Sequence, residues 1–100
     1  MRAGRTDTNQ TEIVEAFRSL GCSVHITSNV SHGFPDIVVG VCGLNLLVEI
    51  KDGNKIPSKR KLTPDEQKWH DEWRGQKVIV ESVDNVIALV NGIKRLGRAA

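Results

Sequence analysis

The sequence predicts an α/β domain with a central mixed sheet flanked by helices, in the element order αβββαβα. Three observations predict this class. Runs rich in β-branched residues alternate with stretches that repeat apolar residues at helical spacing. Glycine, proline and asparagine separate these segments. No internal repeat or low-complexity tract interrupts the 100 residues, so we expect a single domain over residues 1–100 with its core at about 8–97.

The first half of the chain is expected to form one helix and three strands. The helix begins among Thr8–Thr11, whose side chains suit an N-cap, and Gly21 is placed to end it. Cys42-Gly43 separates the second strand from the third and suits a two-residue hairpin turn, because glycine accepts a positive φ. The expected strands are residues 24–28, 36–41 and 44–51.

The second half is expected to supply a helix, a strand and a last helix. Thr63-Pro64-Asp65-Glu66 is a capping box with proline at the first helical position, and this helix runs to Arg74, before Gly75. A strand follows at 77–81. The apolar stripe of the last helix comprises Val86, Leu89, Val90, Ile93 and Leu96.

Composition excludes several classes of protein. Charged residues at 26% with mixed signs argue against a disordered chain, and the longest apolar run is far short of the roughly 18 residues of a membrane span. Cys22 and Cys42 follow no metal-ligand or redox spacing and suit a reducing cytoplasm, so we expect a cytoplasmic protein. His25 and His70 have no ligand-like spacing, so zinc is not expected. The net charge of +2 is too small to indicate a nucleic-acid partner by itself.

The expected hairpin brings ionisable side chains together. With Cys42 and Gly43 as the loop, Asp36 faces Glu49, and Lys51 emerges on the same side of the sheet. Two facing carboxylates about 5 Å apart repel by roughly 3 kcal/mol at an effective dielectric constant of about 20. Such a pair shares a proton or binds a cation, and an all-oxygen site suits Mg²⁺ or Mn²⁺. The alternative is a salt-bridged hairpin end without a ligand, which a loop shifted by one residue would give.

These residues also match a known family. Pro35-Asp36, followed after twelve residues by Glu49-Ile50-Lys51, resembles the PD-(D/E)xK nuclease signature. Over about residues 10–92 the chain resembles the virus-type replication-repair nuclease domain, VRR-NUC, in its small stand-alone phage form. The resemblance implies a restriction-endonuclease-like αβββαβα core. The further matching segments are Glu12, Gly33–Asp36, Leu62–Gln67 and Gly75–Val80.

The resemblance implies a metal-dependent endodeoxyribonuclease, a hydrolase that cuts DNA phosphodiester bonds. Asp36, Glu49 and the backbone carbonyl of Ile50 would hold Mg²⁺ or Mn²⁺. Lys51 would orient or help deprotonate the attacking water, or stabilise the transition state. Stand-alone members form homodimers that cut branched DNA such as four-way (Holliday) junctions, so a second copy and branched DNA are the expected partners. A phage-encoded chain would act in the host cell cytoplasm.

Two helical residues join the expected site through the resemblance. Glu12 lies at the edge of the apolar stripe of the first helix and is expected as a further metal ligand. A favourable charge in the first helical turn is the alternative. Gln67 is expected among the catalytic residues, where its amide would bind a water or a phosphate; an exposed helix glutamine is the alternative.

The loop after the third strand is basic. Residues 51–61 carry five lysine or arginine residues against a single acid, Asp52. Because this loop leaves directly from the end of the proposed catalytic strand, we expect it to bind phosphates rather than to be merely solvated. Such contacts give affinity without sequence specificity. The expected DNA-binding residues are Lys55, Lys59, Arg60 and Lys61.

Two other functions stay open. One is a non-catalytic DNA-binding module on the same scaffold, and the other is a nuclease acting on linear duplex or single-stranded DNA. Asp36, Glu49 and Lys51 speak against the first, since a retired site has no reason to keep unfavourable charge.

Overall fold

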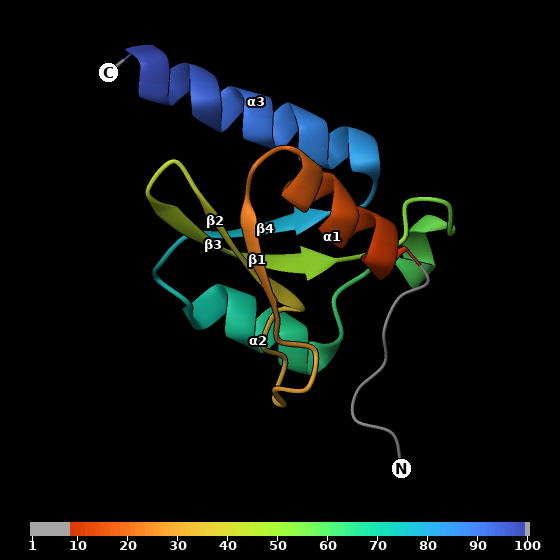
Figure 1. Ribbon diagram of the computed structural model, residues 1–100. Coiled ribbons are helices and arrows are strands. Elements are labelled where there is room, and N and C mark those ends of the chain that lie inside the picture. The colour runs from red at the N-terminus through yellow and green to blue at the C-terminus, as the bar shows by residue number, and fades with distance from the viewer. Residues whose placement is uncertain (1–8, 100) are drawn as a thin grey trace.

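The chain forms three layers in a computed structural model that describes residues 9–99 (Figure 1). A sheet lies between α2 on one side and α1 with α3 on the other, and the element order αβββαβα is the predicted one. A short 3-10 turn, η1, is added in the loop before α2. The elements are α1 (Gln10–Ser19), β1 (Ser23–Ile26), β2 (Ile37–Val41), β3 (Leu44–Ile50), η1 (Pro57–Lys59), α2 (Pro64–Glu72), β4 (Lys77–Val80) and α3 (Val83–Ala99).

The sheet is mixed, as predicted, with the strand order β1-β2-β3-β4. β2 pairs antiparallel with both β1 and β3, whereas β3 and β4 run parallel. Ile37 lies opposite Val48, which confirms the predicted hairpin register. Cys42 and Gly43 have φ values of 52° and 79°, the two positive angles that a tight hairpin turn requires. This register places Asp36, the residue before β2, beside Glu49.

The core lies between the sheet and the pair α1 and α3. Alternate residues of β2 and β3 face this side, because successive side chains of a strand point to opposite faces. The intervening residues, Glu49 among them, therefore point to the side that α2 covers. The buried apolar residues are Ile13, Val14, Phe17, Cys22, Ile37, Val39, Val41, Leu46, Val48, Ile50, Val80, Val86 and Val90.

The last two helices depart from the prediction at their C-terminal ends. α2 ends at Glu72 rather than Arg74, because the backbone of Trp73 is extended, with φ −74° and ψ 129°. Trp73 then stacks on Trp69, with ring centroids 4.9 Å apart. Leu96, the last residue of the expected apolar stripe of α3, is 73% exposed, since the C-terminal end of α3 extends away from the sheet (Figure 1). Among residues 9–99, no helix is long and apolar enough to cross a membrane.

The loop between β1 and β2 is held at both ends, and it leads directly into Asp36. Thr27 donates hydrogen bonds from its backbone N–H to the carbonyl of Asp36 and from its hydroxyl to that of Pro35, each at 2.8 Å. Gly33, with φ +80°, packs on the first turn of α2. A Cβ there would collide with the carbonyl oxygen of Asp65 and lie 2.7 Å from the backbone nitrogen of Glu66. Glycine is therefore required for this loop to approach α2.

We expect Gly33→Ala to lower the free energy of unfolding by about 3 kcal/mol, because the new Cβ must displace backbone atoms and also strains φ. Gly43→Ala is the matched control, because Gly43 has φ +79° but no neighbouring atom within 4 Å of the added Cβ. Its expected cost is about 1 kcal/mol, from backbone strain alone. Urea denaturation measures both values. Equal losses would contradict the close packing of Gly33 on α2.

Candidate functional site

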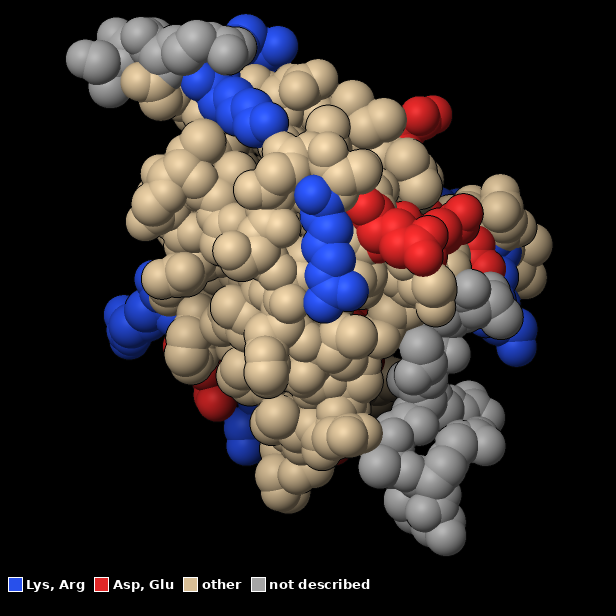
Figure 2. All heavy atoms as spheres, viewed as in Figure 1, with Lys and Arg blue, Asp and Glu red and all other residues tan. Residues whose placement is uncertain are grey.

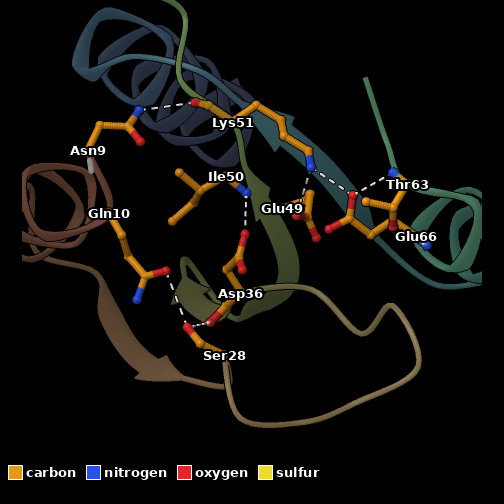
Figure 3. A network of polar contacts seen from close by, with 9 residues as sticks. All are labelled: Asn9, Gln10, Ser28, Asp36, Glu49, Ile50, Lys51, Thr63 and Glu66. Carbon is orange, nitrogen blue, oxygen red and sulfur yellow. Dashed lines mark hydrogen bonds and ion pairs between the residues drawn. The ribbon is translucent and has the colours of Figure 1, made fainter. Parts of the chain in front are cut away.

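A cluster of ionisable side chains lies at the carboxyl end of β3, on the side of the sheet that α2 covers (Figure 3). Glu49 is 2% exposed, and its Oε2 lies 3.7 Å from Nζ of Lys51. Asp36 accepts a hydrogen bond at 2.7 Å from the backbone nitrogen of Ile50 through Oδ2. The structure thus brings together Asp36, Glu49 and Lys51, the three residues that the predicted hairpin register placed on the same side of the sheet.

Glu66 enters the same cluster from α2. Its Oε1 accepts a hydrogen bond from Nζ of Lys51 at 2.7 Å and another from the backbone nitrogen of Thr63 at 2.8 Å. The hydroxyl of Thr63 in turn accepts from the backbone nitrogen of Glu66 at 3.2 Å, which completes the predicted capping box. Sequence reasoning assigned Glu66 to the cap alone. Glu66 stands three and four positions before Trp69 and His70 and therefore shares their face of the helix, which was the signal that it also faces the sheet.

Burial and neighbouring negative charge govern the protonation of this cluster. Burial, followed by the charges of Asp36 and Glu66, raises the pKa of Glu49 to about 10. The Lys51 ammonium lies 3.7 Å from Glu49 and bonds Glu66 more closely, at 2.7 Å, so it does not outweigh these effects. Burial also raises the pKa of Glu66, but hydrogen bonds from Lys51 and Thr63 outweigh it and hold that pKa below its usual value. Without a cation, Glu49 therefore keeps its proton at neutral pH.

The donor set fits a hard divalent cation. Asp36 and Glu49 supply carboxylate oxygens, and the adjacent Ile50 supplies a backbone carbonyl, the ligand types that Mg²⁺ and Mn²⁺ prefer. Oε1 of Glu49 is buried and has no hydrogen-bond partner among residues 9–99. A cation bound to this oxygen would supply the missing interaction. Within the same residues, no group of three or more His, Cys, Asp and Glu side chains is arranged as a metal site by itself. Carbonyl oxygens and waters would complete the coordination.

Glu12 does not join the cluster. It is exposed and lines a polar hollow with Asp52 and Glu81. Figure 2 shows acidic side chains gathered over α1, whose Glu12 and Glu15 are both exposed. The residues just before Glu12 that point inward are Asn9 and Gln10. Gln10 lies three and seven positions before the buried Ile13 and Phe17, and this helical spacing is the signal in the sequence that could have identified Gln10 as a buried residue.

Gln67 also lies outside the cluster. It is exposed and donates a hydrogen bond from Nε2 to Oδ1 of Asp71 at 2.8 Å, one turn further along α2. A step of one residue rotates a side chain by about 100° around a helix, so Glu66 and Gln67 cannot face the sheet together. The structure selects Glu66.

The basic loop divides into exposed lysines and one structural arginine. Lys55, Lys59 and Lys61 are exposed to solvent. Arg60 is half-buried and pairs with Oε1 of Glu81 at 3.2 Å, which ties the loop to the end of β4. Arg60 was expected to bind DNA, but its guanidinium is engaged within the fold.

Comparison with known proteins finds two solved structures of similar fold. One, described as a VRR_NUC domain, is 28% identical, with 82% of this chain and 89% of that chain covered and a TM-score of 0.59. Another, described as a VRR_NUC domain protein, is 18% identical, with 93% of each chain covered and a TM-score of 0.56. No family model and no curated protein matches the sequence. Both similarities confirm the predicted restriction-endonuclease-like core.

We expect Glu49→Gln to stabilise the metal-free protein at pH 8. Glu49 is protonated in the folded state up to a pKa of about 10 and in the unfolded state only to about 4.5. The folded state therefore binds more protons between these values, and stability falls as the pH rises through that range. Glutamine resembles the protonated carboxyl and removes this loss, and the two pKa values set an upper limit of about 5 kcal/mol on the gain at pH 8.

Thermal denaturation in a chelator at pH 5 and pH 8 measures this effect. The gain should be small at pH 5, where wild-type Glu49 is protonated in the folded state. Glu15→Gln, a change at an exposed carboxyl of α1, is the matched control. A gain for Glu49→Gln that is the same at both pH values would rule out a buried proton on Glu49.

Proposed function

Because the chain is a VRR-NUC domain, a nuclease fold, we propose that it hydrolyses DNA phosphodiester bonds with a divalent metal ion held by Asp36 and Glu49. The observation that carries this proposal is the buried Glu49 carboxyl beside Asp36, with Lys51 and Glu66 around it. Like charges gathered in a buried place cost stability unless a cation or a proton compensates them. A structural role alone gives no reason for this arrangement.

Each residue of the cluster has a role that follows from its contacts. The N–H of Ile50 orients the Asp36 carboxylate, and Glu49 releases its proton when a cation takes its place. When bound, the metal ion lowers the pKa of a water molecule and stabilises charge on the phosphate. Lys51, held between Glu49 and Glu66, orients the attacking water or stabilises phosphate charge. Glu66 fixes the Lys51 ammonium through the hydrogen bond of 2.7 Å.

We propose Mg²⁺ or Mn²⁺ as the metal, and branched DNA such as a four-way junction as the substrate. A homodimer would supply two active sites for paired cuts across a junction. Exposed Ile87 and Leu96 on α3 support an interface between two copies. A nuclease that acts on linear duplex or single-stranded DNA is the alternative. Comparing cleavage of branched, duplex and single-stranded DNA distinguishes the two.

The test incubates the protein with four-way junction, flap, duplex and single-stranded DNA, each with Mg²⁺, Mn²⁺ or a chelator. We expect metal-dependent cleavage, fastest on the junction. Asp36→Asn and Lys51→Ala should each lower the cleavage rate about 100-fold or more, since both groups act in the transition state. Gln67→Ala is the control on the exposed side of α2 and should stay within about threefold of wild type. Absence of metal-dependent cleavage on every substrate would refute the proposal.

The lysines of the basic loop are proposed to contact phosphates. Lys59→Ala with Lys61→Ala should weaken DNA binding on all sequences and reduce the slope of log K against log salt by about 2, one unit for each lost phosphate contact. Arg60→Ala should instead leave this slope unchanged and lower the melting temperature, because it breaks the pair with Glu81. Fluorescence anisotropy over a range of salt concentrations measures the slopes. A slope changed by Arg60→Ala alone would reverse this assignment.

A further inference from the structure

Asn9 occupies the N-cap position of α1 but does not cap the helix. The side chain makes no hydrogen bond to the helix backbone. Its Nδ2 instead donates to the backbone carbonyl of Lys51 at 3.0 Å and to that of Glu81 at 3.3 Å (Figure 3). Two carbonyl oxygens accept only from the NH₂ of the amide, which fixes its orientation. Asn9 thus joins residues that are 42 and 72 positions away in the sequence.

These two carbonyls lie just beyond the parallel pair of strands. β3 ends at Ile50 and β4 ends at Val80, so the regular ladder stops before Lys51 and Glu81. The backbone nitrogen of Lys51 donates to the carbonyl of Val80 at 3.0 Å. Together with Asn9, this bond holds Lys51 through both its N–H and its carbonyl. Lys51 therefore has a fixed backbone although it lies outside the strand.

The Asn9 side chain bears a cost that capping would avoid. Asn9 is 7% exposed, and its Oδ1 is buried without a hydrogen-bond partner among residues 9–99. An asparagine that caps a helix uses this oxygen to accept from a backbone N–H of the first turn. A buried acceptor without a partner is unfavourable, so the gain must come from the two bonds that Nδ2 makes. Those bonds end on the backbone that carries Lys51.

We propose that Asn9 is a positioning residue that sets the place of the Lys51 ammonium for the nuclease reaction, an inference that rests on the function proposed above. Nζ of Lys51 has to meet Glu66 at 2.7 Å while staying 3.7 Å from Glu49. A lysine side chain is long and flexible, so its tip holds such a position only if the backbone beneath it is fixed. The bond to Val80 fixes the N–H of Lys51, and the bond from Asn9 fixes its carbonyl.

The next residue, Gln10 of α1, is linked through Ser28 to the segment that carries Asp36. Gln10 is 6% exposed, and its Oε1 accepts from the hydroxyl of Ser28 at 3.2 Å. The Ser28 hydroxyl also lies 3.5 Å from the carbonyl oxygen of Asp36 (Figure 3). The first turn of α1 is thus seated between the segments that carry Lys51 and Asp36. This agrees with a role for Asn9 in the site rather than in α1 alone.

The test uses two variants that keep α1 capped. Serine and aspartate are both good N-cap residues, but neither can donate to the two carbonyls as the Asn9 amide does. For Asn9→Ser and Asn9→Asp we expect kcat to fall about 10- to 100-fold, with KM for DNA within about twofold of wild type. The substrate is whichever of the four DNA forms wild type cuts fastest, at saturating metal. A purely structural Asn9 predicts wild-type kcat for both variants, and that result would overturn the inference.

Asn85→Ala is the matched control. Oδ1 of Asn85 accepts a hydrogen bond from the backbone nitrogen of Glu81 at 2.9 Å. Asn85→Ala therefore removes a side-chain hydrogen bond to the end of β4, where Asn9 also binds, without changing any contact of Lys51. We expect kcat within about twofold of wild type for this variant. An equal loss of kcat in Asn85→Ala and the Asn9 variants would show that any loosening of this corner has the same effect, and would also overturn the inference.

A second measurement does not depend on activity. In metal-free protein labelled with ¹⁵N-lysine, the ammonium of Lys51 should give a slowly exchanging NMR signal because it bonds Glu66. We expect this signal to shift and to exchange faster in Asn9→Ser but not in Asn85→Ala. If wild type cuts no DNA, the proposed nuclease function fails, while the NMR comparison still decides whether Asn9 positions Lys51. An unchanged Lys51 signal in Asn9→Ser would overturn the inference even in an active enzyme.

Discussion

The burial of the Glu49 carboxyl is the constraint on which the rest of the site depends. A carboxyl that is 2% exposed and lies near two others must carry a proton or meet a cation, because it has no access to bulk water. The Lys51 ammonium bonds Glu66 rather than Glu49 most closely, so it cannot do this alone. The hairpin register, the capping box of α2 and the first turn of α1 all hold groups around this one buried carboxyl.

Most of the fold could be predicted from the sequence because its signals are local. The Cys42-Gly43 turn and the alternation of the two flanking strands define the hairpin register, and that register alone places Asp36 beside Glu49. Glu66 was found only as a capping residue, because the cap is a local signal whereas its bond to Lys51 depends on how α2 sits on the sheet.

The predicted site residues that the structure leaves outside the cluster share a physical cause. Glu12 and Gln67 both lie next to a residue or turn that does face the site, and a shift of one helical position turns a side chain by about 100°. Arg60 was counted as a free charge because its partner, Glu81, lies on another strand end. Asn9 was one of several candidate N-cap residues in the segment 8–11, and nothing near it in the sequence indicates carbonyls that are 42 and 72 residues away. Long-range polar contacts of this kind leave no periodic pattern.

Oε1 of Glu66 accepts two hydrogen bonds, one from the cap of α2 and one from Lys51. Helix stability and the placement of the ammonium therefore draw on the same oxygen atom. During evolution, position 66 is exposed to two selective pressures at once, and a drift that is neutral for folding is not neutral for the reaction. Glutamine would preserve a capping box while changing the charge that Lys51 meets. Variation at this position among descendants of the chain would thus adjust the chemistry while leaving the scaffold intact.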